Sequence, residues 1–270
     1  MKNTLIRIGF ISAVASTVFS SNVMADSTLD KVKSTGNMTV AYRESSIPFS
    51  YLGDDGRPVG FGWEICRRIV DEVKKQTGRN DLVVASQAVT SQNRIPLLQN
   101  GTVDIECGST TNNATRQKDV AFAVTTYVEE VRIAVKANSG ITSLNQLNGK
   151  KVATTTGTTS VQLLRKHERA TGVNFDEVFG KDHADSFLLL ESGRADAFVM
   201  DGSILAGNIA NSKNPSDYKI VGEVIAVEPI AIMIRKDDPD FKKSVDDSIK
   251  KMMKDGMLAK LWDKWFLQPI

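Results

Sequence analysis

The stretches LLQNGTVDI (residues 97–105) and LLESGRADA (residues 189–197) share one pattern. Each contains two leucines, a polar pair, a glycine, two further residues, an aspartate and an apolar residue. Because glycine commonly ends a helix in the left-handed conformation, each stretch predicts a helix that leads into a strand. Coincidence is the alternative, since such joints are common in α/β folds. We interpret the repeat as a sign of two lobes of similar construction.

Strand-like and helix-like segments alternate along the rest of the chain. Residues 38–44 and 82–89 resemble strands, whereas residues 61–78 place apolar side chains on one helical face and end at a glycine. This alternation predicts an α/β fold with mostly parallel sheets. Ligands of open α/β sheets bind at the carboxyl ends of the strands. Both repeats lead into polar segments at such ends, CGSTTNNATR (107–116) and VMDGS (199–203).

Residues 1–25 have the anatomy of a secretory signal peptide. Lys2 and Arg7 form a basic segment, a short apolar segment follows, and residues 23–25 resemble a cleavage site. The apolar segment is too short to span a bilayer, and a buried N-terminal helix is the alternative. We therefore expect an exported mature chain that begins near residue 26.

The charge balance of the chain gives no sign of a nucleic-acid partner. The whole chain has 34 lysines and arginines against 32 aspartates and glutamates, and two of the basic residues lie in the predicted signal peptide. The mature chain is therefore close to neutral, whereas nucleic-acid-binding domains are usually basic. No nucleophile–base motif and no zinc-ligand spacing occurs in the sequence. We expect no metal and no cofactor, and we place the acidic pairs Asp54-Asp55 and Glu129-Glu130 on surface loops.

The two cysteines suggest a disulfide bond, because exported proteins meet an oxidising environment. Cys66 lies in a helical pattern and Cys107 ends a strand-like run. Closing the loop between them would stabilise the fold by about 3–4 kcal/mol in the chain-entropy model. Two buried free thiols are the alternative.

Two polar segments that follow predicted strands are candidate anion sites. In the first, Ser109, Thr111 and Arg116 offer hydroxyl groups and a guanidinium group, which suit a carboxylate. The second, ATTTGTTS (153–160), opens through Gly157 into a helix whose first backbone N–H groups can bind an anion. It lacks the lysine of a phosphate-binding loop, so we do not expect a nucleotide. Ordinary helix capping is the alternative for both segments.

Three arginines, Arg43, Arg94 and Arg116, each follow a predicted strand. An α-amino dicarboxylate needs several donors for its two carboxylates and an acceptor for its ammonium group. Asp201 follows an apolar strand and is the candidate acceptor, and His183 precedes a helix and could donate to the distal carboxylate. Solvated arginine and histidine side chains and a helix-capping aspartate are the alternatives.

With these features, the chain resembles the extracytoplasmic solute-binding proteins of bacterial ABC amino-acid transporters, in particular the glutamate/aspartate-binding members. The resemblance covers the predicted mature chain, and its most specific stretches are TSQNRIPLLQNGT (90–102), ECGSTTNNATRQK (106–118), TTGTTS (155–160), KDHADSF (181–187) and LLESGRADAF (189–198). It implies the type II periplasmic binding protein fold, with two α/β lobes joined by two crossings and a ligand cleft between them. Lobe 1 would contain residues 26–128 and 227–270, and lobe 2 residues 129–226.

The resemblance also implies ten ligand-binding residues. The α-carboxylate would be held by Ser109, Thr111, Arg116 and, from the opposing lobe, Thr158. Asp201 would accept from the ammonium group. The end of the cleft that receives the side-chain carboxylate would be lined by Arg43, Ser91, Arg94, Thr155 and His183.

The function implied by the resemblance is the capture of glutamate or aspartate in the periplasm and its delivery to an ABC permease, by a monomer that is not an enzyme. One alternative is an enzyme on the same fold, similar to cyclohexadienyl or arogenate dehydratases. Such an enzyme needs a general acid in the cleft, and we expect no carboxylate there other than Asp201. A protein that presents bound ligand to a receptor is a third interpretation.

Overall fold

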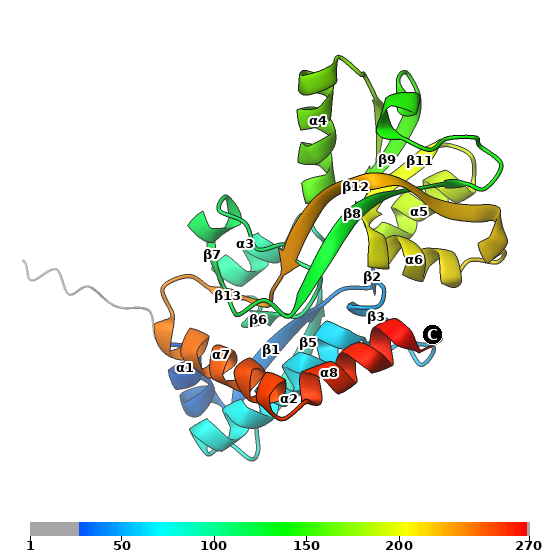
Figure 1. Cartoon of the computed structure of the whole chain (residues 1–270). Helices are drawn as coiled ribbons and strands as arrows, with labels where there is room; N and C mark the ends of the chain where they lie inside the picture. The colour runs from blue at the N-terminus through cyan, green and yellow to red at the C-terminus, as the bar shows by residue number, and fades with distance from the viewer. Residues whose placement is uncertain (1–26, 269–270) are drawn as a thin grey trace, which may run out of the picture.

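Two five-stranded sheets, each covered by helices on both faces, form two lobes in the computed structural model, which describes residues 27–268 (Figure 1). In lobe 1 the strand order is β5 (Val83–Ala88), β1 (Asn37–Tyr42), β6 (Ile105–Glu106), β13 (Met233–Arg235) and β7 (Val120–Phe122). Strand β1 is parallel to β5 and β6, and β13 is antiparallel to β6 and β7.

The helices of lobe 1 lie on opposite faces of its sheet. One face is covered by α2 (Phe61–Thr77), α1 (Thr28–Thr35), α7 (Pro239–Lys254) and α8 (Met257–Trp262), and the other by α3 (Arg94–Gln99). The apolar stripe expected on residues 61–78 is buried, since Ile65, Ile69 and Val73 have no exposed surface. Lobe 1 also contains the helical turns η1 (Arg116–Lys118) and η4 (Asp263–Leu267), and the small sheet of β2 (Ser45–Ser46), β3 (Ser50–Leu52) and β4 (Pro58–Val59).

Lobe 2 has the strand order β10 (Asp176–Gly180), β9 (Lys151–Thr155), β11 (Ala197–Asp201), β8 (Tyr127–Lys136) and β12 (Tyr218–Ile230). Strand β9 is parallel to β10 and β11, and β8 is antiparallel to β11 and β12. Helix α4 (Thr159–Thr171) packs on one face, and α5 (His183–Glu191) and α6 (Gly202–Ala210) pack on the other. The short helical turns η2 (Leu144–Leu147) and η3 (Pro215–Asp217) complete the lobe.

Each half of the sequence repeat forms the predicted joint. The first half runs from α3 into β6 and the second from α5 into β11, and the glycines at the turns, Gly101 and Gly193, have positive φ angles of 79° and 73°. The predicted α/β architecture of two lobes is therefore confirmed. The expectation of mostly parallel sheets is wrong, since each sheet is mixed: β13 in lobe 1 and β8 in lobe 2 pair antiparallel with both of their neighbours.

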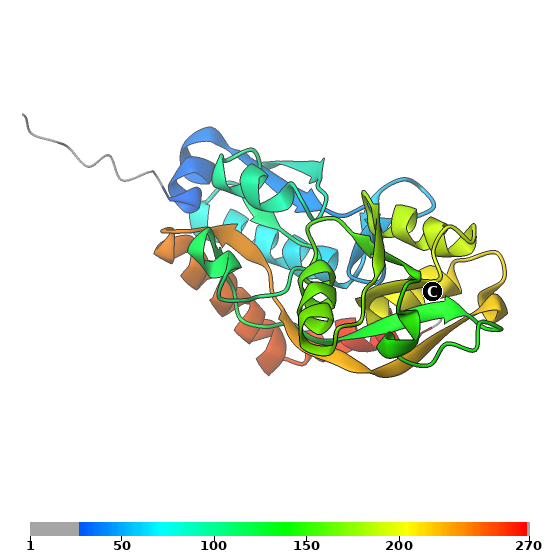
Figure 2. The ribbon, with the colours of Figure 1, turned by 90° about the horizontal axis from the view of Figure 1, so that it is seen from above.

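The two long antiparallel strands β8 and β12 run from one lobe to the other, green and orange in Figure 1. They pair from Tyr127 opposite Ile230 to Lys136 opposite Tyr218. Seen from above in Figure 2, the lobes lie side by side with β12 extending between them. The lobe boundaries expected at 128/129 and 226/227 fall within these strands and stay predictions.

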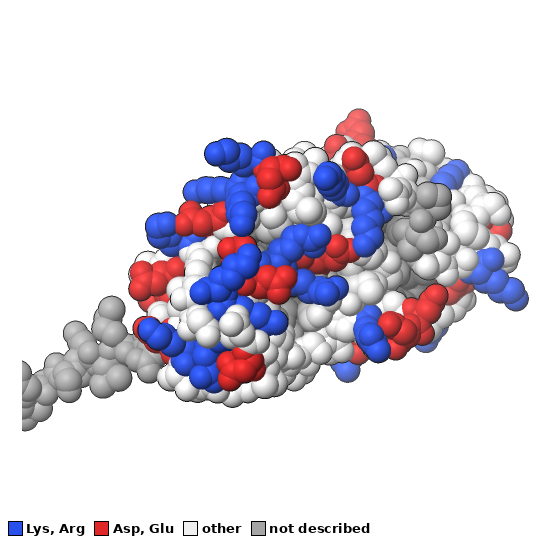
Figure 3. Space-filling view, turned by 90° about the horizontal axis from the view of Figure 1, so that it is seen from below, with Lys and Arg blue, Asp and Glu red and all other residues white. Residues whose placement is uncertain are grey.

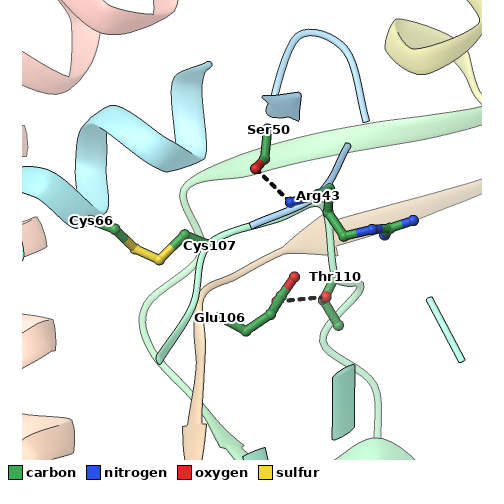
Figure 4. Close-up of a disulfide and its surroundings, with 6 residues drawn as sticks. All are labelled: Arg43, Ser50, Cys66, Glu106, Cys107 and Thr110. Carbon is green, nitrogen blue, oxygen red and sulfur yellow. Dashed lines mark hydrogen bonds between the residues drawn. A yellow bond between two sulfur atoms is a disulfide. The ribbon is translucent and has the colours of Figure 1, made fainter. Parts of the chain in front are cut away.

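The expected disulfide joins Cys66 of α2 to Cys107, which follows β6 (Figure 4). Their Cα atoms are 6.1 Å apart, and both residues have no exposed surface. Arg43, Ser50, Glu106 and Thr110 lie on the Cys107 side of the bridge in Figure 4. The bridge therefore attaches the largest helix of lobe 1 to the segment that carries Ser109 and Thr111.

Replacing both cysteines by alanine should lower the free energy of unfolding by about 4 kcal/mol, because the bridge closes a loop between residues 41 positions apart. Urea denaturation of the double variant and the parent measures the difference. The parent treated with reductant after unfolding is the control, and it should match the variant. A difference below about 1 kcal/mol would contradict the chain-entropy estimate.

No helix within residues 27–268 combines the length and the apolar content that crossing a membrane requires. The face in Figure 3 intersperses basic and acidic side chains rather than presenting one continuous basic patch. The predicted signal peptide, residues 1–25, lies outside the described residues.

Candidate functional site

The carboxyl ends of parallel strands from both lobes face one cleft. From lobe 1, β1 leads to Arg43, β5 to Ser91 and Arg94, and β6 to the segment from Ser109 to Arg116. From lobe 2, β9, β10 and β11 lead to the starts of α4, α5 and α6. This is the position at which α/β sheets bind ligands.

A small polar cavity lies between the lobes. Eight of the ten residues predicted to bind ligand line it, namely Ser91, Arg94, Ser109, Thr111, Arg116, Thr158, His183 and Asp201. The other two lie next to His183. The Thr155 hydroxyl is 2.9 Å from His183 Nδ1, and Arg43 Nη2 is 3.5 Å from His183 Nε2. Thr159 and Met200 also line the cavity and were not predicted.

The lobes contact each other across the cleft, so the structure is closed. Arg43 of lobe 1 donates to Asp182 of lobe 2 at 2.5 Å, and the Arg116 guanidinium donates to the Gly157 carbonyl at 3.2 Å. A Cβ atom at Gly157 would lie 2.7 Å from the Cα atom of Gln92, which is too close for any side chain. Glycine at this position lets the two backbones meet.

Arg94 is a buried cation without a partner. The residue is 2% exposed, and its Nε atom is buried without a hydrogen-bond partner among residues 27–268. Burial, and next the neighbouring Arg116, hold the pKa of Arg94 well below its usual value. A buried charge without an ionic partner is costly, so Arg94 is a candidate for binding an anion.

The three arginines at strand exits differ in their pairing. Arg43 is fully buried and paired with Asp182, but its Nε and Nη1 atoms lack partners. The Arg116 guanidinium donates to two backbone carbonyls, of Thr111 at 2.9 Å and of Gly157. Neither Arg94 nor Arg116 has a carboxylate within ion-pair distance in the described part of the chain. The alternative of solvated arginines is therefore wrong for Arg43 and Arg94.

Asp201 precedes α6 but does not cap it, because its side chain makes no hydrogen bond to the first turn. The same holds for Thr158 before α4 and Asp182 before α5, whereas Ser27 and Asp238 do cap α1 and α7. The capping alternative is therefore wrong at these cleft positions. Asp201 is 1% exposed and its Oδ1 atom has no partner. Burial, and next Glu129 and Glu228, raise the pKa of Asp201 well above its usual value.

His183 is held as a neutral imidazole. The residue is 1% exposed, and burial together with the Arg43 charge lowers the pKa of His183 to about 3. Its Nδ1 atom faces the Thr155 hydroxyl and its Nε2 atom faces Arg43. The imidazole therefore adds polar groups to the cleft without adding a charge at neutral pH.

The expectation that Glu129 lies on a surface loop is wrong. Glu129 belongs to strand β8 and is 3% exposed, whereas Glu130 is exposed, because consecutive residues of a strand point to opposite faces. Glu129 Oε1 accepts from the backbone N–H groups of Glu130 at 2.9 Å and Ser203 at 3.3 Å. Burial raises the pKa of Glu129.

Asp201 is also not the single carboxylate near the cleft, contrary to the expectation. Glu106 is fully buried at the end of β6 and accepts from the Thr110 hydroxyl at 2.8 Å. Glu228, 7% exposed on β12, accepts from Thr111 and Thr159. Among residues 27–268 no three histidine, cysteine, aspartate or glutamate side chains gather in a way that could hold a metal ion.

Comparisons with known proteins agree with this architecture. The family model of the bacterial extracellular solute-binding proteins, family 3, matches residues 38–268. The chain is 44% identical to the L-glutamate/L-aspartate-binding protein of Pseudomonas aeruginosa over 263 residues, which cover 96% of this chain and 87% of that protein. It is 47% identical to the glutamate/aspartate import solute-binding protein of Escherichia coli over 246 residues, or 91% and 82% of the two chains.

The fold also matches a solved structure. A mutant of ArgBP from T. maritima superposes with a TM-score of 0.79 at 28% sequence identity, covering 89% of this chain and 99% of that one. The two α/β lobes of this chain therefore have the type II periplasmic binding protein fold expected from the sequence. The two relatives from P. aeruginosa and E. coli are named as binding proteins, not as enzymes. With the family model covering nearly the whole described chain, the protein belongs to the bacterial extracellular solute-binding proteins, family 3.

Proposed function

We propose that this protein captures L-glutamate or L-aspartate in the closed cleft, in the periplasm, and delivers it to an ABC permease. The observation that carries the proposal is that Arg94, whose buried Nε atom has no partner, lines the same small cavity as Asp201, whose Oδ1 atom has none. An α-amino dicarboxylate supplies an anion for the first and an ammonium for the second. The two relatives described above are named for binding these two amino acids.

In this proposal the two carboxylates of the ligand meet different parts of lobe 1. The α-carboxylate binds Arg116, with Ser109, Thr111 and, from lobe 2, Thr158 completing its surroundings. The side-chain carboxylate binds Arg94 at the end of the cleft formed with Ser91, Arg43, Thr155 and His183. Arg43 has free Nε and Nη1 donors even while Asp182 occupies Nη2. It can therefore donate to the side-chain carboxylate of the ligand and to Asp182 at the same time.

The enzyme alternative has less support than capture and delivery. Glu129 and Asp201 are buried carboxyl groups with raised pKa values, a property also found in general acids. However, Glu129 already accepts two backbone hydrogen bonds, and Asp201 is the acceptor that a ligand ammonium requires. The names of the relatives describe binding and import. Delivery by closure requires the ligand to favour the closed state over the open one.

L-Glutamate and L-aspartate should bind tightly, and L-glutamine about 10⁴-fold more weakly, because a neutral amide leaves a buried arginine unpaired. Isothermal titration with all three amino acids measures the difference. The protein should first be unfolded, dialysed and refolded to remove ligand that it carries, and mass spectrometry of the released molecule identifies that ligand. Equal affinity for glutamine would contradict the proposed specificity.

A further inference from the structure

Glu228 occupies an unusual place at the junction of the lobes. It lies on the crossing strand β12, directly opposite Glu129 of β8, and is 7% exposed. It does not line the ligand cavity. No lysine, arginine or histidine side chain of residues 27–268 lies within ion-pair distance of it. A buried carboxylate without a cationic partner needs strong hydrogen-bond donors.

The donors to Glu228 come from both lobes and meet at one oxygen. Its Oε2 atom accepts from the Thr111 hydroxyl of lobe 1 at 2.6 Å and from the Thr159 hydroxyl at the start of α4 in lobe 2 at 2.7 Å. Hydrogen bonds to a carboxylate are short and about twice as strong as those between neutral groups. Because the two hydroxyls belong to different lobes, opening the cleft separates them, and a single oxygen cannot keep both.

These bonds also decide what the two hydroxyls can offer to a ligand. A threonine hydroxyl has one proton to donate and two lone pairs that accept. In the closed structure the protons of Thr111 and Thr159 are both directed to Glu228, although both residues line the cavity. Their oxygens can therefore only accept from a ligand. An ammonium group donates, whereas a carboxylate accepts.

We propose that Glu228 is a positioning residue that fastens the two lobes in the closed state and turns the Thr111 and Thr159 hydroxyls into acceptors for the ligand ammonium. The ammonium part of this inference rests on the proposed function. Thr111 then serves the α-carboxylate through its backbone N–H alone, and its hydroxyl joins Asp201 as an acceptor. Glu228 acts on binding without touching the ligand.

A double-mutant cycle tests this inference. Glu228→Leu and Thr159→Val should each weaken L-glutamate binding about 10- to 100-fold, since each removes a hydrogen bond to a charged group. The conservative variants Glu228→Gln and Thr159→Ser should recover most of the affinity. Because the two residues act together, the combined Glu228→Leu/Thr159→Val variant should lose at least about fivefold less than the product of the single losses. Losses that multiply, or a Glu228→Leu affinity within twofold of the parent, would overturn the inference.

A second measurement separates failure of this inference from failure of the proposed function. Spin labels on cysteines introduced at the exposed Gln117 of lobe 1 and Gln162 of lobe 2 report the distance between the lobes without any ligand. The ligand-free parent should populate the closed distance, and Glu228→Leu should reduce that population at least threefold. An unchanged closed population in the variant, or none in the parent, would overturn the fastening role. A parent that binds neither acidic amino acid would refute the proposed function alone.

Discussion

Replacing Arg94 by methionine should weaken the binding of L-glutamate and L-aspartate by about 10²- to 10⁴-fold, the loss expected when one partner of a buried ion pair is removed. The same change should leave the free energy of unfolding of the ligand-free protein equal to that of the parent or higher. Arg94 is 2% exposed and unpaired in the closed cleft, so methionine, of similar length and without charge, removes an uncompensated cation. Arg94 would thus lower the stability of the ligand-free protein while providing the charge that binds the ligand.

Titration calorimetry and urea denaturation of the same preparations check both halves of this prediction. Arg57→Met is the matched control, because Arg57 lies on an exposed turn with a side chain that is 83% accessible. It should change neither affinity nor stability by a measurable amount. An Arg94→Met protein that binds within tenfold of the parent would remove Arg94 from the ligand site, and a large loss of stability would make it a structural residue.

Replacing Asp201 by asparagine should likewise weaken binding by about 10²- to 10³-fold while stabilising the ligand-free protein. The pKa of Asp201 is raised in the folded state by burial and by the neighbouring glutamates. Its contribution to stability is therefore fully present below the unfolded carboxyl pKa of about 4 and is lost as pH rises through the folded pKa. Asparagine does not ionise, so the stability gain of the variant should grow with pH and vanish in acid.

The same raised pKa makes ligand binding depend on pH. An ammonium group favours the ionised form of Asp201, so binding lowers its pKa and releases a proton. Affinity should therefore rise with pH up to the raised pKa of the ligand-free protein. Calorimetry in buffers of different ionisation enthalpy measures the released proton directly. Asp201→Asn should abolish the release, and a release that persists in the variant would assign the proton to another group, with Glu129 the first candidate.

Much of the fold and part of the cavity lining followed from local features of the sequence. The repeat at residues 97–105 and 189–197 carries its helix, glycine and strand within nine positions, so it could be predicted without knowledge of distant contacts. Arg94 and Asp201 could be selected as candidates because each follows a strand, and parallel strands end at the same edge of a sheet. Their lack of partners depends on the closed lobes and is visible only in the structure.

The buried glutamates could not be found in this way. Glu129 and Glu228 lie opposite each other because β8 pairs with β12, and nothing in either segment alone indicates that pairing. Glu129 was misplaced because an adjacent pair of acidic residues usually lies on the surface, whereas the pleat of a crossing strand buries one residue and exposes the next. Thr159 was missed since a row of threonines does not reveal which hydroxyl faces the cleft.

The three arginines lie on lobe 1, and Asp201 lies on lobe 2. Under the proposed function this division separates the capture of the ligand from the closure of the cleft in time. An incoming dicarboxylate is attracted to one lobe, where both of its anionic ends find donors while the cleft is still open to water. Lobe 2 gains an ionic contact with the ligand only when Asp201 reaches the ammonium group. A dicarboxylate without an amine can therefore occupy lobe 1, but closure over it rests on the lobe–lobe contacts alone, such as Arg43–Asp182. The amine therefore adds to the stability of a closed state that the lobe–lobe contacts already favour.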